Sequence, residues 1–508
     1  MKSPRNFSLK KGITLFLSLI FTCVIHSQSW DQVGSKIEGD NGADQMGFHV
    51  SFNADGTIFA SSSPRNDTNG ENSGQVRVYE FQSGNWTQIG QELLGNEASD
   101  LFGFSLDISD DGTILAIGAP SSSANPDGKG FVQVFQYTEI SNTWTQIGQT
   151  IEGDFIEDQM GYSVSLNEDG TTLAVGANRH DNSVERTGQI KVFQLQSNTW
   201  NPLGNIIFGE NSGDLIGTSL SLNKQGNRLV SGGTSSNTGF TNGGHVKVFE
   251  LVGTTWNLMG NPFYGLHSSE GLGYSVSFND EGTIVAMSAL GNDDVFDFAG
   301  RVSVYQFDGS DWVQIGSHIY GTQEFELTGD SISLNGSGNI LAIGGSSNGI
   351  VGPFAGFTRV FQNQSGNWVQ IGNHILAESF GDSCGSSVSM NDSGNKVVIG
   401  SSTGYNGGDD SGHVRVFETN LSTLSTDDVL LSSHDVSLFP NPASDVISLA
   451  SEITFEEANV YDASGRLILK NQSLENKKVD ISELNSGIYV IQFMTKDRKA
   501  ITKKFLKR

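Results

Sequence analysis

Residues 161–177 read GYSVSLNEDGTTLAVGA, and their pattern indicates the class of fold. Small polar and apolar residues alternate in its first half, and a second apolar run ends it. Alternation with a period of two predicts β-strands, and the Asp169–Gly170 pair between the two runs predicts a tight hairpin. Residues 189–195 and the segment around Trp200 predict a third and a fourth strand. One stretch of the chain therefore encodes four short antiparallel strands.

The same four-strand unit recurs along the chain. All seven tryptophans occupy one position of the repeat, 56 or 58 residues apart: Trp30, Trp86, Trp144, Trp200, Trp256, Trp312 and Trp368. A period in this range indicates a solenoid, an array or a propeller. Four antiparallel strands per unit favour a propeller in which each unit is one blade. A tryptophan in every unit predicts packing between blades, with a sugar-stacking platform as the alternative.

The order of strands at the two ends predicts how the propeller closes. The repeats begin with a fourth strand around Trp30 and end after a third strand at residues 414–417. We therefore predict an all-β fold with a seven-bladed β-propeller over residues 28–419. Residues 30–38 would supply the outer strand of the last blade, which leaves no open sheet edge. A linear solenoid would instead leave an orphan strand at each end.

The composition limits the compartment and the partners. The chain holds 63 glycines and 9 prolines, as expected for many short strands joined by glycine turns. Its formal charge of −27 argues against a nucleic-acid partner, because phosphates are bound by clustered Lys and Arg. Basic residues followed by an apolar run predict a cleaved secretory signal peptide at residues 1–27. One thiol, Cys384, would then remain, and we expect it to be buried.

The second unit of the repeat carries a pair of recognisable motifs. Phe102–Gly103 opens its first strand, and Gly118–Ala119–Pro120 ends its second strand. These residues resemble the FG-GAP repeat of the integrin alpha propeller and of many exported bacterial proteins. The resemblance implies the calcium loop that integrin repeats often carry between the first two strands. Calcium takes six to eight oxygen ligands, and this turn is too short to match that loop, so no calcium, other metal or cofactor is predicted.

A second module follows a Ser/Thr/Asp-rich linker at residues 420–434. Residues 435–508 are expected to form a small β-sandwich of their own. Its motif residues are Phe439, Pro440, Asn441, Pro442, Asp445, Gly465, Gly487 and Tyr489. They resemble the C-terminal sorting domain, subfamily A, of the type IX secretion system of the Bacteroidetes. The resemblance implies export by that machinery, removal of the domain by a sortase-like peptidase, and a secreted or outer cell-surface location.

One acidic residue recurs in every unit, three positions before the glycine of the first strand. The seven are Asp44, Asp100, Asp158, Asp214, Glu270, Glu326 and Asp382. At one mouth of a central channel they would form a candidate acidic ring for a cationic ligand. The alternative is that each carboxylate accepts backbone N–H bonds in its own turn. We favour the alternative, since identity in every unit is typical of a structural role and seven converging charges repel.

The loops between the second and third strands differ most from unit to unit, as at residues 65–67, 179–181, 293–294 and 354–356. In a propeller they lie on the same face as the acidic turns, and variable loops on a rigid scaffold carry binding. No nucleophile or zinc-protease motif occurs, so no catalytic residue is predicted. We therefore predict an exported, non-enzymatic propeller that binds a protein or glycan through this face. The alternatives are a polysaccharide hydrolase or lyase with paired carboxylates, and a purely structural surface component.

Overall fold

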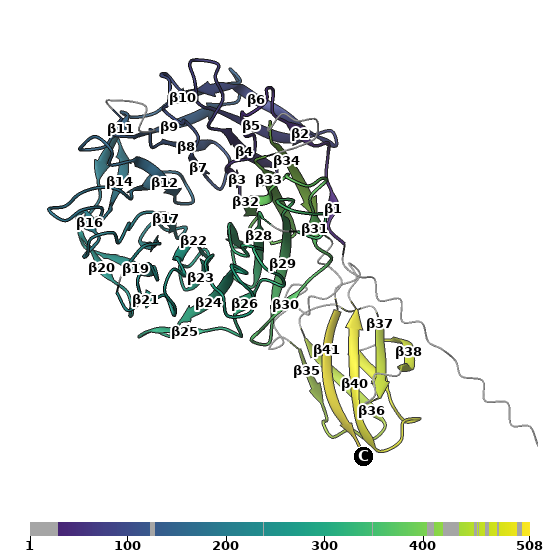
Figure 1. The fold of residues 1–508 in the computed structure, drawn as a ribbon. Coiled ribbons are helices and arrows are strands. Elements are labelled where there is room, and N and C mark those ends of the chain that lie inside the picture. The colour runs from purple at the N-terminus through teal and green to yellow at the C-terminus, as the bar shows by residue number, and fades with distance from the viewer. Residues whose placement is uncertain are drawn as a thin grey trace, which may run out of the picture. The chain divides into compact units, whose positions relative to one another are not determined.

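The computed structural model describes residues 29–508 except 122–127, 237, 348, 404–410, 420–435, 452–454, 456, 463–466, 475–476 and 495–499. The predicted signal peptide and linker lie outside the described residues. The chain divides into two compact units, Met1–Thr419 and Asn420–Arg508 (Figure 1). The fold is all-β, as the sequence predicts.

Seven antiparallel sheets make up the first unit, and they are arranged in a ring (Figure 1). The first strands, nearest the centre, are β3 (Val50–Phe52), β7 (Ser105–Ile108), β12 (Met160–Leu166), β17 (Ser219–Leu222), β22 (Leu272–Phe278), β27 (Ile332–Leu334) and β32 (Cys384–Met390). The second strands are β4 (Ile58–Ser63), β8 (Ile114–Ala119), β13 (Thr172–Ala177), β18 (Arg228–Gly233), β23 (Ile284–Ala289), β28 (Ile340–Gly345) and β33 (Lys396–Ser401). The third strands are β5 (Gln75–Gln82), β9 (Phe131–Thr138), β14 (Gln189–Gln196), β19 (His245–Val252), β24 (Arg301–Phe307), β29 (Phe357–Gln364) and β34 (His413–Glu418).

The outer strand is continuous in one sheet, as β6 (Asn85–Leu94), and is split in two in the others. The split pairs are β10 (Thr143–Gln146) with β11 (Ile151–Glu152), β15 (Thr199–Pro202) with β16 (Ile207–Phe208), β20 (Thr255–Leu258) with β21 (Phe263–Tyr264), β25 (Trp312–Gln314) with β26 (Ile319–Tyr320), β30 (Asn367–Gln370) with β31 (Ile375–Leu376), and β1 (Asp31–Gln32) with β2 (Ile37–Glu38). The sequence predicts a single strand here. A glycine with a positive φ lies at this point, such as Gly148 with a φ of +69°. Gly90, with a φ of +71°, occupies the same position within the continuous β6, so this conformation alone does not split the strand.

The tryptophans join neighbouring sheets, as the repeat predicts. Each indole N–H donates a 2.8–3.2 Å hydrogen bond to a backbone carbonyl of the preceding sheet. The acceptor is Ile89 within the continuous β6, and in the other sheets it lies between the two parts of the split outer strand. Trp200 is typical, since it is 2 % exposed and bonds the carbonyl of Ile147. A Cβ on Gly148 would lie only 2.5 Å from Cδ1 of this tryptophan. The indole therefore packs where the glycine leaves room for it.

The two ends of the first unit meet in one sheet. β1 and β2 pair antiparallel with β34, the third strand of the sheet that β32 and β33 begin. At the centre, the backbone N–H groups of Val50 and Phe52 donate to the hydroxyls of Ser387 and Ser389, each at 3.0 Å. The first and last sheets therefore contact each other along their innermost strands.

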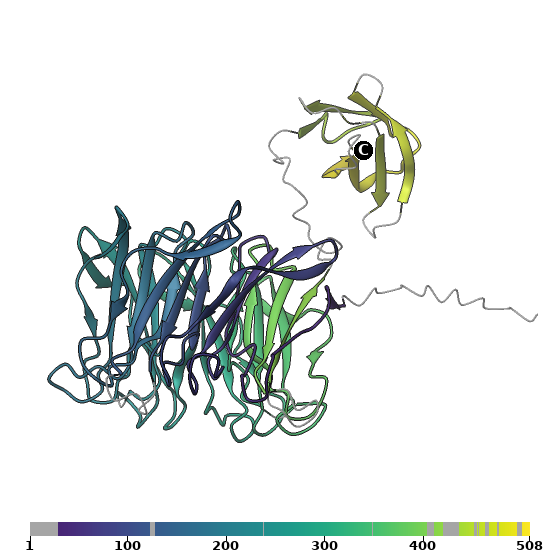
Figure 2. The same ribbon diagram turned by 90° about the horizontal axis from the view of Figure 1, so that it is seen from above.

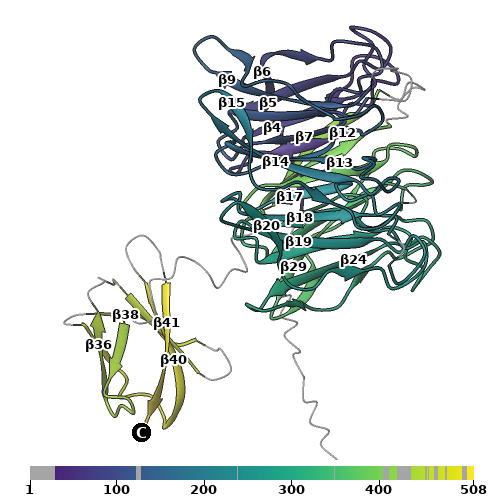
Figure 3. The ribbon, with the colours of Figure 1, turned by 90° about the vertical axis from the view of Figure 1, so that its left-hand side faces the viewer.

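A circle of backbone hydrogen bonds joins the turns between the first and second strands. In each sheet, one amide donates to a carbonyl of the next sheet at 2.9–3.1 Å. The series runs through Ala54, Asp110, Glu168, Lys224, Asp280, Gly336 and Asp392, and it returns to Ala54. In side view, the sheets stand side by side and their connections gather at two opposite faces (Figures 2 and 3).

The second unit contains two sheets. One is formed by β35 (Val436–Phe439), β36 (Val446–Ser451) and β39 (Lys478–Asp480). The other is formed by β38 (Leu467–Ser473), β37 (Glu457–Asp462), β40 (Gly487–Met494) and β41 (Ala500–Lys507). Ile447 of the first sheet and Ile491 and Phe493 of the second belong to one buried apolar cluster. The two sheets therefore enclose a common core.

Candidate functional site

The seven acidic residues predicted as a ring lie in the turns that lead into the first strands, and all are 0–3 % exposed. Asp382 is representative, because its Oδ2 accepts the backbone N–H groups of Glu378 and Ser379, both at 2.8 Å. The other six accept backbone N–H groups in the same way. None of the seven lines the central cavity described below. The geometry therefore matches the structural alternative for these carboxylates.

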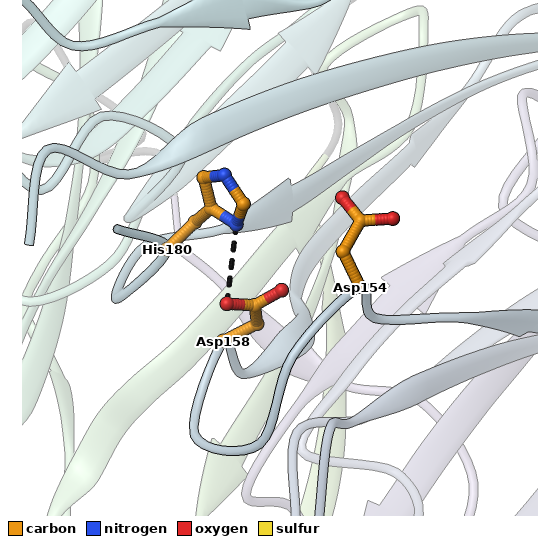
Figure 4. Close-up of side chains that lie close together, drawn as sticks. All are labelled: Asp154, Asp158 and His180. Carbon is orange, nitrogen blue, oxygen red and sulfur yellow. Dashed lines mark ion pairs between the residues drawn. The ribbon is translucent and has the colours of Figure 1, made fainter. Parts of the chain in front are cut away.

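Asp158 belongs to a cluster that has the composition of a metal site. Among the described residues, one group of potential ligands lies within 4.8 Å of one another, and it is formed by Asp154, Asp158 and His180 (Figure 4). Nδ1 of His180 is 3.1 Å from Asp158, and its ring packs against Phe155 and Phe208.

The cluster does not fit a metal, because internal partners already hold its ligands. Lys191 Nζ lies 2.7 Å from both carboxylate oxygens of Asp154. An equivalent ion pair occurs in other sheets. Arg77 pairs with Asp40 in the first sheet, and Lys247 pairs with Glu210 in the fourth. The pairing of His180 with Asp158 also has equivalents in other sheets. Asn66 donates to Asp44 and Asn292 donates to Glu270, each at 3.0 Å. The cluster is therefore two repeated structural pairs that happen to be neighbours.

The loops between second and third strands lie on the same face as the acidic turns, as expected. In the fifth sheet, the amide of Phe325 donates to the backbone carbonyl of Asp297 at 2.8 Å, and that of Leu327 donates to the backbone carbonyl of Phe298 at 3.2 Å. Thirteen apolar side chains on these loops and turns are 40–66 % exposed. They are Phe155, Ile156, Val184, Phe240, Leu266, Val295, Phe296, Phe298, Phe325, Ile350, Val351, Phe354 and Phe380, and we call them the apolar loop face. Two of them, Phe298 and Phe325, stack with ring centroids 5.7 Å apart.

A central cavity of about 490 Å³ is lined by the first strands of all seven sheets. Two layers of serines run around the ring on these first strands, and all of them except Ser277 and Ser333 line the cavity. One layer is formed by Ser105, Ser163, Ser219, Ser275, Ser331 and Ser387, and the other by Ser51, Ser165, Ser221, Ser277, Ser333 and Ser389. Many of these hydroxyls accept a backbone N–H from the neighbouring first strand, as Ser221 does from Phe278 at 3.1 Å. The serines therefore hold adjacent sheets together at the centre of the ring.

Two residues break the serine layers. His49 stands in the first layer and Asp107 in the second, each at the position of the missing serine. Asp107 accepts bonds from the amide of Leu166 at 2.8 Å and the hydroxyl of Ser51 at 2.9 Å, so it also holds two sheets. Burial lowers the pKa of His49 to about 4 and raises the pKa of Asp107 to about 6.

Lys224 occupies the opposite end of the ring, within the circle of turn residues. Its Nζ lies 2.7 Å from Asp110, 3.3 Å from Asp280 and 2.5 Å from Asp392. Burial opposes the charge on this ammonium group, but its carboxylate partners outweigh burial and raise its pKa. One cation therefore neutralises carboxylates from three sheets that are not adjacent.

In the second unit, the Pro-Asn-Pro motif contacts the last strand. Oδ1 of Asn441 accepts the amide of Leu506 at 2.9 Å, and the amide of Ala443 donates to the carbonyl of Leu506 at 2.8 Å. Phe439, Pro440 and Asp445 are exposed, and Pro442 is half-buried. Gly487 begins β40, and Tyr489 stacks on Phe505 at 5.8 Å. Gly465 lies outside the described residues.

Comparison with known proteins identifies the second unit. Residues 437–508 match the family of secretion system C-terminal sorting domains. The protein is therefore exported by the type IX secretion system to the cell surface or the extracellular space, and that machinery is a partner. No helix in the described part of the chain is long and apolar enough to cross a membrane.

The first unit is similar in fold to solved WD40 repeats, those of RRP9. The WD40 repeats of RRP9 are 13 % identical, cover 77 % of this chain and 100 % of that chain, and give a TM-score of 0.50. U3-55K is 13 % identical, covers 76 % of this chain and 98 % of that chain, and gives a TM-score of 0.46. An endo-acting ulvan lyase of Formosa agariphila is 30 % identical over 93 residues. That match spans 17 % of each protein, so the chain covers a small part of the relative's length.

The sequence pattern missed the central cavity and the Lys224 cluster. Both would have been visible as departures from the repeat. His49 and Asp107 interrupt serine positions, and Lys224 is a basic residue at a turn position that is acidic in four other units. A comparison of the units for the residues they share does not reveal such exceptions. In a repeat protein, however, a unique site is formed by residues that depart from the repeat.

Proposed function

We propose that the first unit is a closed seven-bladed β-propeller of FG-GAP type that serves as an exported, non-enzymatic binding module. It would recognise an extracellular protein or glycan through the apolar loop face. The circle of turn hydrogen bonds and the pairing of β1 and β2 with β34 support closure. The observation that carries the binding proposal is the gathering of thirteen exposed apolar side chains on one face.

These side chains have the chemistry of a recognition surface. Contiguous exposed apolar patches on soluble proteins usually mark interaction sites. Seven of the thirteen are phenylalanines, and aromatic residues are enriched at interfaces because they bury a large area with few rotatable bonds. The loops that carry them are held by backbone bonds to the next turn, so little order would be lost on binding.

The test is a binding screen of the full chain against extracellular glycans and surface proteins. Phe298→Ser combined with Phe325→Ser removes the stacked pair of the apolar loop face. Ile140→Ser combined with Val252→Ser removes two residues that are 101 % and 61 % exposed on the opposite face, and it is the matched control. Binding lost in the first variant alone supports the proposal. Equal binding by both variants and the parent chain contradicts it.

A polysaccharide-degrading enzyme is the second candidate, because of the similarity to the ulvan lyase. A lyase leaves an unsaturated sugar end that absorbs ultraviolet light. Incubating the full chain with ulvan and following this absorbance separates the two candidates. Sustained turnover would replace the binding proposal, and binding without turnover would exclude this second candidate for ulvan.

A further inference from the structure

The central cavity has an aromatic collar toward the apolar loop face. Phe48 and Phe104 lie 5.1 Å apart between ring centroids, and Phe104 and Tyr162 lie 4.9 Å apart. Tyr274 also lines the cavity and is 45 % exposed, so it is accessible. These four residues occupy one repeat position in different sheets, just before the serine layers. Aromatic faces of this kind attract cations and the C–H groups of ligands.

The charged groups of the cavity are all acidic. Asp330 occupies the collar position of the sixth sheet, where its side chain is hydrogen-bonded to Tyr274 and Ser346. Asp107 lies three strand positions deeper by repeat register, which corresponds to about 10 Å along a strand. No lysine or arginine is among the residues that line the cavity in the described part of the chain. His49 is neutral near pH 7, because burial lowers its pKa to about 4.

We propose that this cavity binds an aliphatic ammonium compound, with its ammonium group at Asp330 and its carbon chain within the aromatic collar. The site is separate from the apolar loop face and does not depend on the binding function proposed above. An anion would meet two carboxyl groups and no basic residue. A neutral polyol could use the serine hydroxyls, but it would leave the carboxyl groups without a counter-charge. An ammonium group supplies that counter-charge and suits the collar.

The titration of the cavity supports this assignment. Burial raises the pKa of Asp330 and of Asp107 to about 6, so both carboxylates take up a proton more readily than an exposed aspartate does. The other titratable groups that face the cavity are His49, Tyr162 and Tyr274. Beyond the wall, Asp110 adds a negative charge near Asp107, and Arg179 adds a positive charge near Tyr162. A bound cation favours the ionised carboxylates, so its affinity should fall as the pH drops below about 6.

The experiment is calorimetric titration of the full chain with 1,5-diaminopentane at pH 7.5, about 1.5 units above the pKa values of Asp330 and Asp107. Pentane-1,5-diol is the matched neutral ligand, with glucose and calcium chloride as further arms. We expect binding of the diamine, much weaker binding of the diol, and loss of diamine affinity at acidic pH. Equal or tighter binding of the diol, of glucose or of calcium would overturn the proposal, and so would the absence of diamine binding.

Two variants locate the site. Asp330→Asn should weaken diamine binding about tenfold or more, as expected for loss of a hydrogen bond to a charged group. Asp297→Asn removes the same charge from an exposed loop position and should leave binding unchanged. Tyr274→Ala tests the collar independently, should Asp330→Asn fail to fold. Diamine binding that survives in the folded Asp330→Asn or Tyr274→Ala protein, or that is lost equally in Asp297→Asn, contradicts the assignment.

Discussion

The backbone amide of Asp392 donates a hydrogen bond to the carbonyl oxygen of Ala54 at 2.9 Å. Asp392 lies in the last sheet and Ala54 in the first, and six equivalent bonds join the other neighbouring sheets. Each sheet is therefore held by a neighbour on both sides, although the first and last are far apart in sequence. The central cavity and the apolar loop face both depend on this ring, because each is assembled from several sheets.

The contact between Gly148 and Trp200 predicts a specific cost for adding one methyl group. Gly148→Ala would place a Cβ 2.5 Å from the indole and would also strain a φ of +69°. Gly84→Ala is the matched control, since Gly84 has a φ of +88° and nothing within 4 Å of its added Cβ. We expect Gly148→Ala to lower the free energy of unfolding by about 1–3 kcal/mol more than the control, which is the usual cost of overpacking. Equal losses in urea denaturation would contradict inter-sheet packing by the tryptophan.

Lys224 predicts a pH-dependent stability. Lys224→Met leaves Asp110, Asp280 and Asp392 without their shared cation, and we expect a loss of about 1–2 kcal/mol at pH 7 for this partly exposed network. Burial already raises the pKa of Asp110 and Asp280. Folding therefore favours their protonated form, and the loss should shrink as the pH falls and the carboxylates take up protons. Denaturant titration at pH 7 and in mild acid measures this.

Lys224→Arg keeps the charge and is the control. Two outcomes would contradict a role for the charge: a loss of stability for Lys224→Met that is the same at both pH values, or an equal loss for Lys224→Arg. Either would show that the contacts of the aliphatic part of the lysine side chain matter instead.

His49 predicts a loss of stability in acid that one substitution should relieve. Its pKa is lowered by burial from 6.5 to about 4, so between these values the unfolded chain binds a proton that the folded chain does not. Stability is then lost as the pH falls through this window, by up to about 3 kcal/mol. His49→Ser restores the residue of the other six sheets and should reduce this loss. His245 and His413, whose pKa values are also lowered to about 4, remain in the variant, so part of the slope should persist.

Thermal melting of the parent chain and His49→Ser from pH 7 to pH 4 makes the comparison. Parallel pH profiles would contradict the assignment of the acid sensitivity to this histidine.

The sorting domain predicts an export defect. Asn441→Ala removes the acceptor for the Leu506 amide and so weakens the contact between the motif and the last strand. We expect the protein to accumulate inside the cell envelope and its secreted fraction to fall severalfold, measured by immunoblotting of cell and medium fractions. Ser444→Ala, at an exposed neighbouring position, should be exported normally. Normal export of Asn441→Ala would show that this contact is dispensable.

The repeat made much of the fold predictable, because the sequence pattern of each unit indicates its own strands. The alternation of polar and apolar residues predicted the first strands. The glycine that recurs at the turn of each unit, such as Gly170 with a φ of +66°, predicted the hairpins. The sequence pattern missed the split of the outer strands and the packing of a neighbouring sheet's tryptophan on the outer-strand glycine, as Trp200 packs on Gly148. That contact is between units, and a pattern read within one unit does not contain it.

The candidate site was less predictable for the same reason. The acidic turns were visible because they repeat, and burial with backbone partners explains why they do. His49, Asp107 and Asp330 occur once each, and only the ring brings them to one cavity. The apolar loop face is likewise spread over loops of different sequence, such as those of Phe298 and Phe354. Its members become neighbours only when the sheets are placed side by side.

Hydrogen–deuterium exchange of β34 tests the ring most directly. β34 is an inner strand only if β1 and β2 pair with it, as Gln32 does with Phe417 and Ile37 with Val414. In the full chain we predict that the amides of β34 exchange as slowly as those of β14, the equivalent strand of the third sheet. Exchange in β34 that is orders of magnitude faster than in β14, as for a frayed edge strand, would contradict the closed ring.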